Sequence, residues 1–171
     1  MNRYFPENFD VVWCGFPYDE ASKNGVVQPG KKSRPCLVVG AETSIHGDQY
    51  LKVAYGTTKI DRNLKYSLLI SPDHGNFMFR DAGLIVTTAF RMDKVAILPF
   101  TSDFFPDIPA MNGLPRRSHC RLGHINEAGR RSLAQVLRAM IEDGIDLDAI
   151  MRGNINKVLK SKSNPRFTCH G

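Results

Sequence analysis

Short apolar runs dominate the first hundred residues of the chain, and each run ends at proline, glycine or a polar cluster. Runs of this kind, rich in β-branched and aromatic residues, predict half-buried β-strands. Five of them are clear, and residues 64–70 are a sixth, more ambiguous candidate because a turn-forming cluster follows directly. The clear runs lie at residues 9–16, 35–40, 50–58, 83–90 and 94–100. Because no helical pattern separates these strands, the sequence favours a small antiparallel barrel or sandwich over a parallel α/β sheet.

Helical periodicity appears only towards the C-terminus. Apolar residues spaced as one helix face predict a helix that begins after the N-cap Asn126 and ends at Gly144. A weaker apolar pattern predicts a second helix over residues 147–159, whereas three prolines predict irregular structure over residues 101–118. The expected organisation is a barrel domain over residues 1–144 and a basic, partly helical extension over residues 145–171. The face of the first helix comprises Leu133, Val136, Leu137, Met140 and Ile141.

Composition narrows the class of protein. A chain of 171 residues with 42% hydrophobic and 23% charged residues is typical of one folded domain. Its longest apolar runs have about a third of the length that a bilayer-spanning helix needs, and no export signal is visible, so the expected location is the cytoplasm. The four cysteines are widely separated, which favours reduced thiols over a disulfide framework: Cys14, Cys36, Cys120 and Cys169.

Positive charge is concentrated at the C-terminal side. Residues 1–115 hold 12 basic and 12 acidic side chains, whereas residues 116–171 hold 11 basic and 5 acidic ones, which accounts for the whole net charge of +6. This distribution suits a polyanion or an acidic protein partner. An ordinary solvated face is the alternative.

Neither a metal nor a nucleotide cofactor is expected. No pair of cysteines or histidines has the spacing of a metal site, and His119 and Cys120 are adjacent, so they would point to opposite sides of a strand. Gly25 and Gly30 lack the context of a phosphate-binding loop. Ser33 and Cys36 are conceivable nucleophiles, but the sequence around them favours structural roles.

A phosphate-binding arrangement is predicted where two strands end. The basic segment Lys31–Pro35 enters one strand, and Thr57, Thr58 and Lys59 leave another. If the two strands are neighbours, a guanidinium fork and short hydroxyl donors converge, and together they suit a phosphodiester. The alternative is a surface arginine before a proline and a threonine that ends a strand.

Six short motifs follow one another along the chain: VVWCGFP (11–17), KSRPCLVV (32–39), VAYGT (53–57), GLIV (83–86), RMDK (91–94) and GHI (123–125). This ordered series resembles the MazF/PemK-type toxins of bacterial toxin–antitoxin modules. The resemblance covers roughly residues 9–143 and implies an SH3-like β-barrel of the CcdB/MazF/PemK type with a C-terminal α-helix. It further implies a homodimer, a cognate antitoxin with an acidic or flexible segment, and sequence-specific, metal-independent cleavage of single-stranded RNA.

The resemblance also implies roles for individual residues. Arg34 and Thr57 match the catalytic arginine and its threonine partner. In PemK-like members an arginine and an aspartate stand where this chain has Val86 and Thr88, so the site supported here is the MazF version. A barrel of the same kind that has lost catalysis and only binds nucleic acid or protein is the alternative function. The expected RNA contacts are Lys31, Lys32, Thr58 and Arg91, with Asp19 or Glu20 from the first loop.

Overall fold

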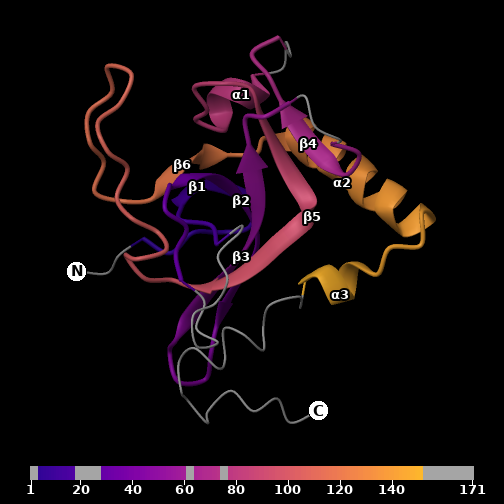
Figure 1. The fold of residues 1–171 in the computed structure, drawn as a ribbon, viewed down its shortest axis with the longest axis horizontal. Helices are drawn as coiled ribbons and strands as arrows, with labels where there is room; N and C mark the ends of the chain where they lie inside the picture. The colour runs from indigo at the N-terminus through magenta and orange to yellow at the C-terminus, as the bar shows by residue number, and fades with distance from the viewer. Residues whose placement is uncertain (1–3, 18–27, 61–63, 74–76, 152–171) are drawn as a thin grey trace.

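A computed structural model of the protein describes residues 4–17, 28–60, 64–73 and 77–151. Six strands form one antiparallel sheet in the order β4-β5-β3-β2-β1-β6, which curls into a half-barrel (Figure 1). The mainly-β fold with a C-terminal helix is therefore confirmed, and of the barrel and the sandwich the structure shows the barrel-like form. The strands are β1 (Asp10–Cys14), β2 (Arg34–Thr43), β3 (Gln49–Thr57), β4 (Ser67–Ile70), β5 (Thr88–Pro99) and β6 (Arg121–His124). The helices are α1 (Met78–Asp81), α2 (Glu127–Glu142) and α3 (Leu147–Met151).

Two of the predicted strands are one strand in the structure. The sequence places separate strands at residues 83–90 and 94–100, divided by the polar Arg91-Met92-Asp93. The structure instead carries β5 through this point, with a jump in register against β3 from Ala54↔Val95 to Tyr55↔Arg91. Polar residues inside a strand are accommodated by a bulge here, which bends the strand without ending it.

Helix α2 begins and ends close to where the sequence predicts. The side chain of Asn126 accepts a hydrogen bond from the Gly129 amide at 3.0 Å, as an N-cap does, and Gly144 follows the helix with a φ of 79°. Leu133 and Met140 are buried against the sheet, but Ile141 is 61% exposed, contrary to the expectation. Ile141 lies about 80° around the helix from Leu133, at the edge of the apolar stripe. Helix α3 confirms the start of the second predicted helix, while residues 152–159 lie outside the described part.

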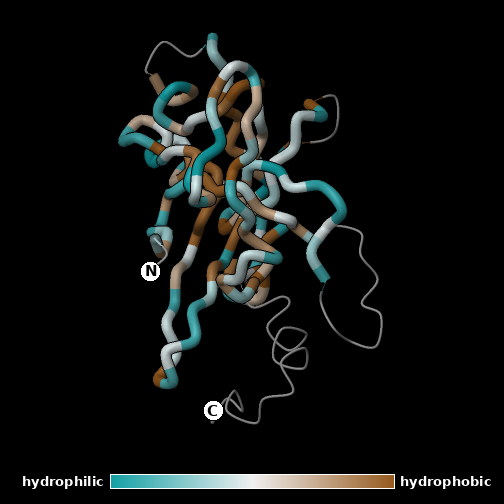
Figure 2. The backbone as a smooth tube through the Cα atoms, turned by 90° about the vertical axis from the view of Figure 1, so that its left-hand side faces the viewer, coloured by the Kyte–Doolittle hydropathy of each residue, from teal (hydrophilic) through white to brown (hydrophobic). Residues whose placement is uncertain are grey.

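The sheet carries a hydrophobic core on each of its faces. One core packs α1 and α2 on residues such as Leu37 and Phe90. The other is covered by the segment between β5 and β6, which contributes Phe104, Phe105 and Cys120. Figure 2 shows many of the apolar residues in the body of the molecule. Within the described residues, no helix has the length and apolar character that crossing a bilayer requires.

Candidate functional site

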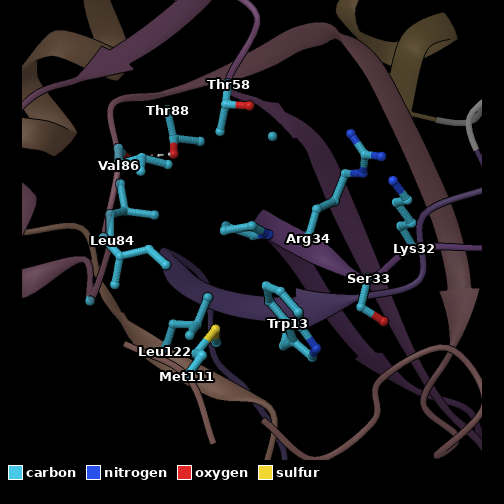
Figure 3. A pocket seen from close by; sticks show the side chains of 14 residues that line it. Trp13, Lys32, Ser33, Arg34, Thr58, Leu84, Val86, Thr88, Met111 and Leu122 are labelled. Atoms are coloured by element: carbon cyan, nitrogen blue, oxygen red, sulfur yellow. Dashed lines mark hydrogen bonds between the residues drawn. The ribbon is translucent and has the colours of Figure 1, made fainter. Parts of the chain in front are cut away.

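A pocket of about 290 Å³ lies where β1 and the ends of β2 and β3 meet residues 83–88 (Figure 3). That volume is near the lower limit for sites that hold small organic molecules. Its lining is chemically divided. The cationic side is formed by Lys32, Ser33, Arg34 and Thr58, and the apolar side by Trp13, Leu84, Met111 and Leu122.

Two glycines allow the backbone to close around the pocket. A Cβ at Gly56 would lie 1.9 Å from the carbonyl oxygen of Pro35, so only glycine lets β3 approach β2 this closely. Gly83 has a φ of +69°, and a Cβ there would lie 2.1 Å from the Leu122 carbonyl oxygen. The shape of the pocket is thus fixed by the main chain.

Arg34 is the most constrained cation of the site. It is the first residue of β2, opposite Cys14 of β1, and its guanidinium donates a hydrogen bond to the Tyr55 hydroxyl. The guanidinium carbon also lies 4.8 Å from the centre of the Tyr55 ring, and the Phe16 ring packs on Tyr55 with 5.2 Å between ring centres. Among the described residues, no carboxylate forms an ion pair with Arg34.

The structure places the two threonines differently. Thr58 is exposed and lines the pocket. Thr57 is only 7% exposed, is not among the lining residues, and its hydroxyl oxygen accepts a hydrogen bond from the Lys59 amide at 3.1 Å. Of the two threonines, the structure therefore places Thr58 in the lining of the pocket and Thr57 outside it.

The other sequence-predicted contacts are dispersed. Lys32 lines the pocket, and its neighbour Lys31 is exposed without lining it. Arg91 lies opposite Tyr55 on β5 and forms a two-pronged ion pair with Asp93, at 3.1 and 2.8 Å, so the structure does not bring it to the pocket. Asp19 and Glu20 lie outside the described residues.

Sequence reasoning missed the apolar side altogether. Trp13 is the only tryptophan of the chain and is half-buried between the buried residues Val12 and Cys14. The available signal was a single tryptophan in a short predicted β-strand, because so large a side chain can remain partly exposed there. Met111 and Leu122 gave no signal, because only the tertiary fold brings them to Trp13.

Three cysteines lie in the core behind the cationic side. Cys14 and Cys36 are fully buried, Cys120 is 1% exposed, and all three are free thiols. Burial raises the pKa of the Cys14 thiol well above its ordinary value, and a hydrogen bond with Cys36 acts in the same direction. A thiol that the core encloses completely cannot reach a substrate, so Cys14 and Cys36 have structural roles. Among the described residues, no group of three or more His, Cys, Asp or Glu side chains is placed to hold a metal ion.

Comparison with known proteins gives a similarity at the level of the fold. No family model matches the chain. No curated protein matches it either. Among solved structures, the chain is similar to the Mycobacterium tuberculosis toxin MazF-mt6, with 14% sequence identity and a TM-score of 0.47, over 80% of this chain and 98% of that one. At this level of similarity, function has to be inferred from the pocket.

Proposed function

We propose that this protein is a MazF/PemK-like toxin that cleaves single-stranded RNA without a metal ion. The observation that carries the proposal is the divided pocket, in which Arg34, stacked on the Tyr55 ring and paired with no carboxylate of the described residues, shares the lining with Trp13. A guanidinium and an indole in one pocket suit a phosphate and the base next to it. The ordered sequence motifs, which place Arg34 and Gly56-Thr57 in the matching positions, support the same function.

The cleavage step needs no external reactant. The 2′-oxygen of the substrate loses its proton and bonds to the adjacent phosphorus, and the bond from phosphorus to the 5′-oxygen breaks. The departing oxygen takes up a proton, which leaves a 2′,3′-cyclic phosphate and a 5′-hydroxyl. Arg34 stabilises the negative charge that builds on the phosphoryl oxygens, and Thr58 donates to one of them. Thr57 acts from one residue away by fixing the turn that carries Thr58 and Lys59.

Binding without cleavage is the second candidate, and one observation favours it. Among the described residues that line the pocket there is no carboxylate, imidazole or phenol to move a proton. Asp19 and Glu20 of the first loop are the acid–base candidates in the cleavage proposal. A module that only binds would use the same pocket, together with the basic residues beyond 115.

The proposal also includes partners. A homodimer and an antitoxin with an acidic segment follow from the resemblance, and the excess of basic residues beyond position 115 supports attraction to an acidic chain. Light scattering on the purified protein tests the dimer. A monomeric mass at micromolar concentration would contradict it.

Incubation with a long single-stranded RNA in EDTA separates the two functions. We expect fragments that end in 2′,3′-cyclic phosphates, and a single-turnover rate about 100-fold lower in Arg34→Ala, as for loss of one transition-state donor. Lys94→Ala, which removes an equal charge from an exposed position of β5 that does not line the pocket, is the matched control and should cleave normally. Intact RNA with folded protein would exclude the nuclease and leave the binding module.

A further inference from the structure

A hairpin finger, defined here as residues 108–117, projects from the segment between β5 and β6. Isolated bridges pair Ile108 with Arg117 and Met111 with Leu114, so only Asn112 and Gly113 form the turn. Both turn residues have positive φ, 49° and 75°, as a type I′ turn requires. In Figure 1 the finger is the salmon loop that rises at the left, past β6.

The base of the finger is fixed to the sheet. Ile108 is 2% exposed, and its amide donates to the His119 carbonyl at 3.1 Å. The Arg117 guanidinium donates to the carbonyl oxygens of Arg121 and Leu122 in β6, at 3.4 and 3.2 Å. Leu122 also lines the pocket, so the Arg117 side chain connects the finger to the wall of the pocket. The two-residue turn and these hydrogen bonds to the sheet make the finger a preformed element.

The tip of the finger supplies one side chain to the pocket. Met111 lines it together with Trp13 and Leu122, and Figure 3 shows its sulfur at the lower edge of the pocket, across from Lys32 and Arg34. Leu114, its cross-strand partner, is 47% exposed and does not line the pocket. The two residues therefore form a matched pair of apolar side chains, of which only Met111 lines the pocket.

We propose that the finger is the specificity element of the site, with Met111 reading the base that stacks on Trp13. This inference rests on the proposed RNA substrate. Contacts to phosphate bind every RNA sequence equally well, so selection of one sequence over another has to come from contacts to the base. The Met111 thioether and the Trp13 indole form a slot, and the size and shape of a base determine whether it fits there. Sulfur also packs favourably on aromatic rings. Arg117 is a positioning residue, which acts by holding the finger against β6.

The test measures selection of bases apart from cleavage. A randomised pool of six-nucleotide RNAs with 2′-O-methyl sugars, which blocks attack by the 2′-oxygen, is bound to the protein, and the bound fraction is sequenced. Dissociation constants are then measured for the preferred sequence and for its single-base alternatives. The variants are Met111→Ala, its control Leu114→Ala, and Arg117→Met beside Arg117→Lys, each checked for an unchanged thermal unfolding transition.

We expect Met111→Ala to reduce discrimination between bases by about two- to tenfold, and Leu114→Ala to leave it unchanged. Arg117→Met should broaden the preference, and Arg117→Lys, which can still donate to the carbonyls, should restore it. If the unchanged protein selects a base and Met111→Ala selects it equally well, the inference is overturned while the proposed function stands. Binding without base preference overturns the inference alone, and absence of binding overturns both.

Discussion

The two sides of the pocket are built on different principles. The cationic side presents Lys32, Arg34 and Thr58, whose charges and hydroxyl suit phosphate oxygens of any sequence. The apolar side brings Trp13 of β1 together with residues more than 70 positions away in the chain. Sequence-independent contacts to phosphate are therefore expected from one side, and stacking and selection of the base from the other, so variants should separate the two.

The largest effect is expected at Gly56, where β3 approaches β2 most closely beside the pocket. Alanine at Gly56 would place a Cβ 1.9 Å from the Pro35 carbonyl oxygen, a backbone atom that cannot move aside alone. We expect Gly56→Ala to lower the free energy of unfolding by about 3 kcal/mol or more. Chemical denaturation measures this. The control is Gly47→Ala, where φ is +83° but no atom lies within 4 Å, so the cost should be only about 1 kcal/mol. Equal costs would show that the strands do not meet this closely.

Replacing Trp13 should weaken the contacts to a base and leave the contacts to phosphate unchanged. Trp13→Ala is expected to reduce RNA affinity about tenfold, because it removes a stacking surface for one base. The slope of log affinity against log salt should not change, since no charge is lost. Fluorescence anisotropy titrations at several salt concentrations provide both values. A changed slope would place phosphate, not base, against Trp13.

Removing a charge should give the opposite signature. We expect Lys32→Ala to weaken all RNA sequences by a similar factor and to reduce the salt slope by about one, because one phosphate contact is lost. The same titrations measure it, with Lys94→Ala on β5 as the equal change in charge. If Lys32→Ala altered base preference, the division of the pocket into two sides would be wrong.

The smallest effect is expected from acid, and it should leave both sides of the pocket intact. Hydrogen bonds from Tyr66 and then Lys65 hold the pKa of Asp143, just beyond α2, below its ordinary value of 3.8. A lowered pKa stabilises the fold above the ordinary value, and this contribution is lost as the pH falls through the lowered one. The pH dependence of unfolding should therefore be slightly shallower below pH 3.8 in Asp143→Asn. An unchanged profile would show that the three groups do not interact in solution.

Local patterns predicted the regular parts of the fold and missed features set by distant contacts. The face of α2 from Leu133 to Met140 could be read from spacing, because helix periodicity is a local property. The polar break at Arg91–Asp93 was misread, because whether such a break ends a strand or bulges depends on the neighbouring strand. The four-residue elements β6 and α1 are too short for periodicity to mark them.

The candidate site was predictable on its cationic side only. Arg34, Lys32 and Thr58 flank strand ends that pair in sequence order, so their convergence follows from a simple antiparallel sheet. Met111 could not be placed, since prolines around it indicated irregular structure over residues 101–118. Asn112-Gly113 is nevertheless a strong signal for a type I′ hairpin, and it would have predicted the finger, though not its position beside Trp13.

The buried cysteines give the protein a built-in reporter of its own opening. Cys14 and Cys36 are fully enclosed, and the raised pKa of Cys14 keeps its thiol unreactive while the sheet is closed. An alkylating reagent can therefore modify these two positions only during an excursion that opens the core between the sheet and the segment that connects β5 to β6. Mass spectrometry of the peptides that contain them would then time those excursions. The strand pair that carries Arg34 thus records how often the core behind the candidate site opens.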